Sequence, residues 1–244
     1  MQLTIKHPFL CLPVVSHPKD TRVLKLFDGE KLLLCVYFPF GEAAADNGTY
    51  SYEYLSPLPV SEWMGRTLTL SAEFPAGFED AVTQTDELPV SGEVHPAVHF
   101  TANAGWINDP NGLVYDNGTY HLYYQHNPFG VNWNNMSWGH ATSTDLLHWT
   151  RLPVAMLPDE EGTIFSGCGL TNEHRDEIQA AADSNLYRSL PKDALLFFYT
   201  AAGGSHDSAC SEGKDYTQHT AYSTDHGLTL QKLPCLLYTS DAAD

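Results

Sequence analysis

The sequence predicts an all-β protein. Short apolar runs alternate with turns rich in Gly, Pro and Asn along the 244 residues, which is the pattern of successive antiparallel strands. No long segment repeats its apolar residues with the period of a helix. In addition, one segment recurs 80 positions further along the chain, and such a repeat is typical of radial β architectures that use the same strand unit more than once.

The N-terminal part contains the first group of predicted strands. Asp28-Gly29 separates two apolar runs and is a hairpin signal. Further on, Pro89, Gly92 and Pro96 interrupt the pattern, which places a domain boundary near residue 90. The predicted strands of this part are "TRVLKLF", "KLLLCVYFPF" and "GRTLTLSAEF".

Beyond this boundary the strand pattern continues and includes the repeat. A turn is predicted at 116–118, where Asp, Asn and Gly follow one another. The segment "HATSTDLLHWTRLP" (140–153) is echoed by "TAYSTDHGLTLQKLP" (220–234), and an apolar run precedes each copy. Two copies predict two consecutive propeller blades. The polar, alanine-rich segment 171–193 is predicted to be an insertion between strands, which would explain why the two copies are further apart than the usual length of a blade.

The composition argues against charged macromolecular partners. Twelve Lys and Arg residues against thirty Asp and Glu residues give a formal net charge of −18, which repels phosphate backbones and anionic membrane surfaces. No stretch has the roughly 20 continuous apolar residues of a membrane span. We therefore expect neither nucleic acid nor a membrane as a partner, and the sequence does not indicate an oligomeric state.

The N-terminus and the cysteines give indications of the cellular compartment of the protein. The first 20 residues contain one short apolar run that is interrupted by Pro8 and Pro13, and they lack a charged n-region followed by a small-residue cleavage site. They are therefore a poor signal peptide, and we expect a cytoplasmic protein, with secretion left open. The five cysteines show neither C-x-x-C spacing nor a dense framework, which predicts buried free thiols rather than a zinc site or disulfides. Scattered histidines and the lack of a glycine-rich phosphate loop predict neither a metal site nor a cofactor.

A possible catalytic residue lies in the stretch "WINDPNG". Pro110 disfavours the helical conformation for Asp109, and Asn111-Gly112 supplies turn chemistry directly after it. The carboxylate is thus predicted to lie at a fixed bend near the end of a strand, facing the centre of a propeller or the rim of a barrel. The structural alternative is that Asp109 only forms the turn, which is a common role for Asp before Pro.

The surroundings of Asp109 favour a carbohydrate pocket. Amides donate to and accept from sugar hydroxyls, and indole faces pack against the C–H surfaces of sugars. The alternative is a β-hairpin with aromatic cross-strand pairs. The amides and indoles close to Asp109 in sequence are Trp106, Asn108, Gln125, Asn127, Trp133 and Trp138.

These residues resemble the start of the catalytic domain of glycoside hydrolase family 32, which comprises invertases, levanases and inulinases. The resemblance runs from about His95 to Pro234 and rests on "WINDPNGLVYDNGTYHLYYQHNPFG", "FSGCG", "YTAAG" and "AYSTD", in this order. It implies a five-bladed β-propeller (91–234, about two blades of it present here) and a retaining β-fructofuranosidase mechanism. Residues 1–90 resemble, more weakly, a small β-sandwich-like domain that precedes some members.

The resemblance also assigns roles to residues. Asp109 matches the nucleophile, and Asn108 matches its neighbour in the fructose site. In a retaining mechanism one carboxylate attacks the anomeric carbon while a second carboxyl group protonates the leaving oxygen. The other predicted substrate-binding residues are Trp106, Gln125, Trp133, Phe165 and Ser166.

Two motifs of the family are missing from the sequence. An Arg-Asp-Pro motif, whose aspartate holds the fructose hydroxyls, and a Glu-Cys motif, whose glutamate is the acid/base, should follow "AYSTD", but neither occurs. The acidic residues at 159–161 read as a solvated loop. The final ten residues, 235–244 ("CLLYTSDAAD"), are predicted to be an adapter-derived artefact. We therefore expect an inactive N-terminal fragment of the enzyme.

Three functions remain open at this point. The first is a glycosidase that releases β-fructofuranosyl units from sucrose or from fructans such as levan and inulin. The second is a catalytically silent fructan-binding protein that keeps the pocket and lacks the acid. The third is a related five-bladed propeller glycosidase that acts on arabinosyl or xylosyl chains. The expected partner in the first two cases is a fructose-containing oligo- or polysaccharide.

Overall fold

In the described residues of the structure, a computed structural model, the regular secondary structure is predominantly β-strand, which confirms the all-β prediction. These residues also include the four-residue helix α1 (Phe78–Ala81) and the 3₁₀ turns η1 (Ser61–Trp63) and η2 (Asn172–His174). In the part of the chain that is described, no helix has the length and apolar character needed to cross a membrane. The described residues are 1–42, 49–89, 96, 98–174 and 189–233. The predicted boundary near residue 90, most of the predicted insertion and the predicted artefact tail lie outside these residues.

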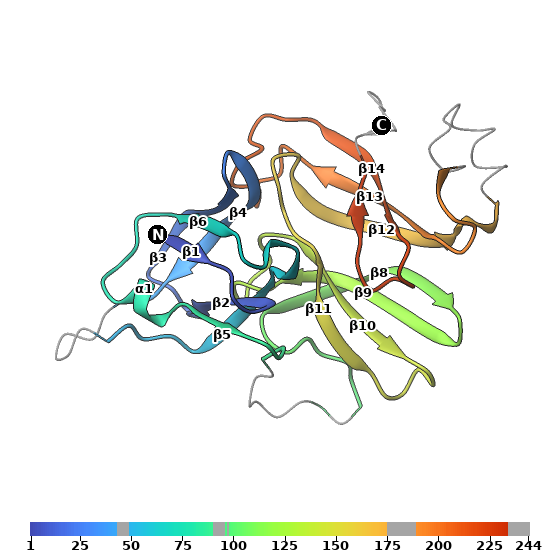
Figure 1. Cartoon of the computed structure of the whole chain (residues 1–244), viewed down its shortest axis with the longest axis horizontal. Helices are drawn as coiled ribbons and strands as arrows, with labels where there is room; N and C mark the ends of the chain where they lie inside the picture. Colours follow the sequence, from blue (N-terminus) through green and yellow to red (C-terminus); the bar gives the residue numbers. More distant parts are fainter. Residues whose placement is uncertain (43–48, 90–95, 97, 175–188, 234–244) are drawn as a thin grey trace.

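Two sheets share one core in the N-terminal part of the chain (Figure 1). Their strand orders are β1-β6-β3-β4 and β5-β2-β7. The β3–β4 hairpin turns at Gly29, which has a φ of +60°, and this confirms the predicted turn. The strands are β1 (Gln2–Thr4), β2 (Phe9–Val14), β3 (Asp20–Asp28), β4 (Lys31–Phe40), β5 (Tyr54–Pro59), β6 (Thr67–Ser71) and β7 (Thr83–Thr85).

The core of this part is built by alternate residues of facing strands. Leu10 on β2, Leu24 on β3, Val36 on β4 and Leu68 on β6 are all completely buried. Phe78 of α1 closes one end of the core and makes an edge contact with the Phe38 ring at a centroid distance of 5.8 Å. Because burial of apolar surface is the main stabilising term in folding, these residues hold the two sheets together.

Two further antiparallel sheets have the form of propeller blades (Figure 1). Within each sheet the four strands pair in chain order, as they do in a blade. The first sheet contains β8 (Trp106–Asp116), β9 (Thr119–Asn127), β10 (Ser137–Ser143) and β11 (Thr150–Met156). The second contains β12 (Thr163–Thr171), β13 (Leu195–Ala202), β14 (Tyr216–Ser223) and β15 (Gln231–Lys232). The first strands of the two sheets, β8 and β12, are in contact with each other.

The predicted hairpin turn and the predicted repeat are both present. Asn117 and Gly118, with φ values of 45° and 85°, connect β8 to β9. The two copies of the repeat occupy equivalent places, since each forms the third strand, the turn and the fourth strand of its sheet. This equivalence supports the prediction of two consecutive blades.

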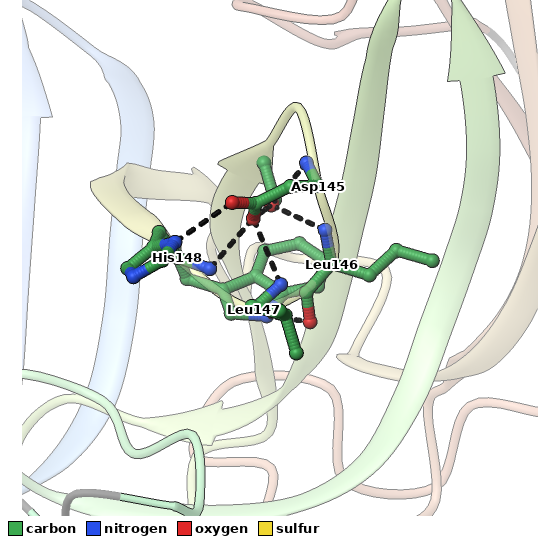
Figure 2. Close-up of polar contacts among 6 residues, drawn as sticks. Asp145, Leu146, Leu147 and His148 are labelled. Atoms are coloured by element: carbon green, nitrogen blue, oxygen red, sulfur yellow. Dashed lines mark hydrogen bonds and ion pairs between the residues drawn. The ribbon is translucent and has the colours of Figure 1, made fainter.

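The repeat encodes a turn that is closed by side chains (Figure 2). In the first copy the Ser143 hydroxyl accepts the backbone N–H of Asp145, and the Asp145 carboxylate accepts the backbone N–H and the ring N–H of His148. In the second copy Ser223 and Asp225 make the same serine–aspartate contact. Such local hydrogen bonds replace the ladder bonds that end at a strand terminus.

The N-terminal sheets are attached to the first blade and to the loop after β13. A disulfide joins Cys35 on β4 to Cys210, with a Cα–Cα distance of 6.0 Å. The Asn135 side chain makes two hydrogen bonds of 2.8 Å with the backbone of Tyr37. In addition, Phe129, which follows β9, is buried in the core of the N-terminal sheets.

The disulfide corrects the prediction of free thiols for Cys35 and Cys210. These cysteines are 175 positions apart, so their spacing carries no signal of a disulfide framework. Cys11 is a buried free thiol, as predicted. Cys168 on β12 is free but exposed, so its predicted burial was wrong.

Candidate active site

Two β-bulges on neighbouring strands build the candidate site. On β8 the pairing with β9 shifts between Ile107 and Pro110, so that Asn108 and Asp109 together oppose a single residue. On β12 the pairing with β13 shifts between Ile164 and Gly167, and Phe165 and Ser166 occupy the same kind of position. A bulge leaves its extra residue outside the ladder and turns its side chain away from the regular alternation.

The two bulges bring a carboxylate and a hydroxyl together. The Ser166 hydroxyl donates a hydrogen bond of 3.1 Å to the Asp109 carboxylate. Both side chains are exposed, so the carboxylate is accessible to a molecule from solvent. Ser166 is thus the side chain that holds the carboxylate in the part of the chain that is described.

The position of Asp109 differs from the prediction in one respect. Asp109 lies within β8 and not at the end of a strand, because Pro110 and Asn111 continue the strand and pair with Tyr124 and Tyr123. The fixed bend predicted from Pro110 is therefore a bulge. Gly112 provides a second irregularity with a φ of +52°, and a Cβ there would lie 2.9 Å from the Tyr123 ring.

Trp106 and Asn108 support the bulge from the same strand. The Trp106 indole N–H donates a hydrogen bond of 2.8 Å to the Asn108 side-chain oxygen. Both side chains are half-buried. This bond fixes the orientation of the Asn108 amide, which leaves its NH₂ group as the free end that can donate to a sugar hydroxyl.

Gln125 lies deeper than its predicted neighbours. It is buried on β9, and its amide nitrogen donates a hydrogen bond of 2.9 Å to the carbonyl of Ile164 on β12. Its side-chain oxygen has no hydrogen-bond partner among the described residues. Gln125 therefore links β9 of the first sheet to β12 of the second, and it retains an acceptor for one further donor.

Aromatic side chains form one side of the site. The ring centroids of Trp133 and Phe165 are 6.0 Å apart, and those of Phe165 and Tyr216 are also 6.0 Å apart. His206 packs against Trp133 at a centroid distance of 5.1 Å. This aromatic wall (Trp133, Phe165, His206 and Tyr216) includes Phe165, which directly precedes Ser166, the residue that is hydrogen-bonded to the Asp109 carboxylate. Such a wall can pack against the C–H face of a sugar.

The sequence interpretation missed Asp207, which follows His206 of the aromatic wall and fixes its loop through hydrogen bonds. Asp207 is almost completely buried. Its carboxylate accepts the hydroxyl of Thr163 and the backbone N–H of Met136, at 3.1 Å each, and the hydroxyl of Ser205. It therefore connects the loop that carries His206 to both sheets. The segment "GGSHDSAC" contains no motif that would have revealed this role, because its partners lie far away in the sequence.

The acidic residues at 159–161 do not belong to the site. Asp159 forms an ion pair of 2.6 Å with Lys232, and Glu161 forms one of 3.3 Å with Lys214. These pairs agree with the interpretation of this segment as a solvated loop. In the described part of the chain no group of three or more His, Cys, Asp or Glu side chains is positioned to hold a metal ion.

Together these contacts describe a site for a neutral polyhydroxy ligand. It offers an accessible carboxylate, amides that can donate and accept, and an aromatic wall. A carboxylate in this setting can act as a nucleophile towards an electrophilic carbon of a bound sugar.

Comparison with known proteins agrees with this description. A sequence model described as "Glycosyl hydrolases family 32 N-terminal domain" matches residues 99–241. The levanase of Bacillus subtilis is 39% identical over 166 residues, which make up 68% of this chain and 21% of the levanase. An extracellular exo-inulinase of Aspergillus niger is 41% identical over 143 residues, which make up 54% of this chain and 25% of the inulinase.

Solved structures give a further match. A β-fructofuranosidase from Schwanniomyces occidentalis complexed with fructosyl-erythritol is 33% identical, with a TM-score of 0.44, and the match covers 57% of this chain and 25% of that chain. The chain thus spans about a fifth to a quarter of the length of these relatives.

Proposed function

The chain belongs to glycosyl hydrolase family 32, and on this premise we propose that it carries the nucleophile of a retaining β-fructofuranosidase. The observation that supports this most directly is the exposed Asp109 carboxylate, which is held by Ser166 in the bulge of β8 beside the aromatic wall. The proposed substrate class is sucrose or a fructan, by analogy with the levanase and the exo-inulinase among the relatives.

The proposed reaction assigns a role to each side of the site. Asp109 attacks C2 of a terminal fructosyl unit, the bond from C2 to the bridging oxygen breaks, and a second carboxylic acid protonates that oxygen. Ser166 keeps the attacking carboxylate in place, and the amides of Asn108 and Gln125 bind sugar hydroxyls. Trp106, Trp133 and Phe165 complete the proposed substrate-binding set.

The second carboxylic acid would be the glutamate of the family's Glu-Cys motif, and this motif does not occur in the 244 residues. General acid catalysis contributes on the order of 10²- to 10⁴-fold, so we propose that this chain alone binds the sugar with little or no turnover. The absence of the Arg-Asp-Pro and Glu-Cys motifs also favours a second candidate function, a fructan-binding protein without catalysis.

The two candidates differ in one experiment. The longest reading frame that contains this sequence is expressed and assayed on sucrose, inulin and levan beside an Asp109→Asn variant. The matched control is Asp159→Asn, which removes a carboxylate that is already paired with Lys232. For the glycosidase we expect fructose release that Asp109→Asn lowers by several orders of magnitude and that the control leaves unchanged. Fructan binding without fructose release would instead support the second candidate.

We also propose the finer architecture and the compartment. The two blade-like sheets within 91–234 are part of a five-bladed propeller, about two blades of which are present here, and residues 1–90 form a sandwich-like domain ahead of it. A disulfide is typical of proteins in oxidising compartments, so the Cys35–Cys210 bond supports secretion, the alternative to the cytoplasmic location expected from the N-terminus. Mass spectrometry of the alkylated native protein under non-reducing conditions tests the disulfide.

A further inference from the structure

A cavity lies where the N-terminal sheets meet the first blade, away from the Asp109 site. It has a volume of about 350 Å³, which falls at the lower end of the range of roughly 300–1,000 Å³ for small-molecule pockets. Strand β5, the segment before β8, and strands β9 to β11 contribute its walls. Asp109, Ser166 and the members of the aromatic wall are not among the residues that line it. We refer to it as the junction cavity.

Three polar atoms of residues that line the junction cavity have no partner in the described part of the chain. The Ser56 hydroxyl is buried without a hydrogen bond. The side chain of Tyr124 is also almost completely buried, and within the described residues its hydroxyl makes no hydrogen bond, so it is available to the cavity that Tyr124 lines. The ring of His126 uses only its Nδ1, which lies 2.8 Å from the carbonyl oxygen of Trp106. Since buried polar groups are nearly always hydrogen-bonded, the buried Ser56 hydroxyl calls for a partner. The Tyr124 hydroxyl and the His126 Nε2 atom are available to bind a molecule in the cavity.

The contact of His126 defines the chemistry of its free nitrogen. A carbonyl oxygen can only accept, so Nδ1 carries the proton and donates it to Trp106. Burial lowers the pKa of His126 to about 4, so the ring is neutral near pH 7 and Nε2 is an acceptor. The cavity therefore offers one acceptor and two hydroxyl groups that can both donate and accept.

The charged residues at the cavity do not provide a site for an ion. Arg151 donates through Nε to the carbonyl oxygen of Thr101 at 2.6 Å, and its guanidinium lies over the Phe100 ring at 5.4 Å. Glu53 is exposed at the mouth. An ion in the interior would lose its hydration without a counter-charge, which is costly. The remaining wall is largely apolar and includes Leu55, Pro57, Val131, Leu152, Pro153 and Val154.

We infer that the junction cavity is a second binding site, separate from the Asp109 site, for an uncharged polyhydroxy compound of the size of a mono- or disaccharide. Hydroxyl groups of such a compound satisfy Ser56, Tyr124 and His126, and its C–H surface packs against the apolar wall. The volume is about ten times the roughly 30 Å³ that one water molecule occupies in the liquid, so it exceeds what a single bridging water needs. This inference does not depend on the activity proposed for Asp109.

The test is a titration of the whole chain, with ¹⁵N labels and with ¹³C-labelled His and Tyr rings, followed by NMR. Fructose, sucrose and glycerol are the probes, each at up to about 100 mM, well above a millimolar Kd. We expect saturable shifts at Ser56, Tyr124 and His126. These shifts should persist in an Asp109→Asn, Trp133→Ala variant, in which the other site is disabled. The two sites, and therefore the two proposals, are thus tested separately.

Variants of the cavity complete the test. Ser56→Ala combined with Tyr124→Phe removes two hydroxyls without adding volume and should weaken binding by about 10-fold or more. Tyr120→Phe is the matched control, since it removes a hydroxyl from the same strand at a residue that does not line the cavity, and it should leave the affinity unchanged. Val154→Phe, which fills the cavity from its wall, should abolish binding.

Two results would overturn the inference. One is the absence of saturable shifts at the three residues with all three probes, which would show that the cavity holds only water. The other is binding that survives both the double variant and Val154→Phe. Thermal melts of every variant show whether it is folded, and if the double variant unfolds, Val154→Phe and Tyr120→Phe alone still decide the outcome.

Discussion

Lowering the pH from 7 to 5 is expected to destabilise this fold by about 4 kcal/mol, because two histidines are buried as neutral rings. Burial, together with the nearby His121, lowers the pKa of His140 to about 3, and burial lowers that of His126 to about 4. In the unfolded chain both pKa values are about 6.5. The unfolded state therefore binds protons that the folded state does not bind, and the free energy of unfolding falls as the pH drops below 6.5.

The size of this destabilisation follows from the difference between pH 5 and the pKa of histidine in the unfolded chain. That difference is about 1.5 pH units, at about 1.36 kcal/mol per unit, so each ring costs about 2 kcal/mol. Both rings remain neutral in the fold at pH 5, and the loss continues until the pH reaches their folded pKa values. A domain with a typical stability of about 5–15 kcal/mol would lose a large part of it.

Burial also lowers the pKa of His121 and of His219, so these two rings add to the loss. The remaining groups with a shifted pKa titrate with a different sign or in a different range. Hydrogen bonds that the His226 ring donates to Asp116 and that the His148 ring donates to Asp145 raise the pKa of each histidine. Their contribution is fully present below pH 6.5 and opposes the loss, but these pairs are exposed and contribute little. The contacts of His148 lower the pKa of Asp145, so the stability that this carboxylate adds is lost only below about pH 4.

Urea denaturation at pH 7 and at pH 5 measures the effect. A His140→Gln variant removes one titrating ring and should reduce the difference between the two pH values by about 2 kcal/mol. His148→Gln, which removes an exposed ring, is the control and should leave the difference nearly unchanged. The reasoning is refuted if the wild-type free energies of unfolding at the two pH values agree within about 1 kcal/mol, or if NMR titration places the pKa of His126 and His140 near 6.5.

Three further predictions concern packing and cross-links, and each is checked by urea denaturation. Gly139→Ala would place a Cβ 2.2 Å from the Tyr124 ring and should cost about 3 kcal/mol; an unchanged midpoint would contradict this packing. Replacing Cys35 and Cys210 by Ser should cost on the order of 2–5 kcal/mol, because the bond closes a long loop, and an equal loss on adding reductant to the wild type is expected. In an Asp207→Asn variant the side-chain NH₂ group can face the backbone N–H of Met136, which is also a donor, so the free energy of unfolding should fall by about 1–3 kcal/mol. An unchanged free energy of unfolding would show that the carboxylate is not needed.

Several features of the fold were predictable from short stretches of sequence. Asp28-Gly29 and Asn117-Gly118 adopt the hairpin turns that their residue types favour. The Ser-Thr-Asp repeat forms the same turn twice, because its hydrogen bonds join residues two to four positions apart. The motif around Asp109 was also sufficient to identify the exposed carboxylate of the candidate site and, through its resemblance, the family.

The tertiary structure decided how these parts meet. The sequence by itself determined the strands, the turns and the candidate carboxylate, since these depend on side-chain alternation and backbone preferences within a few residues. The bulge that exposes Asp109 and its contact with Ser166, 57 positions away, depend on how two strands pair and pack. The same holds for the Cys35–Cys210 bond across 175 positions and for the junction cavity. Contacts of this kind leave no local pattern, because they arise only when distant segments bury their apolar faces against each other.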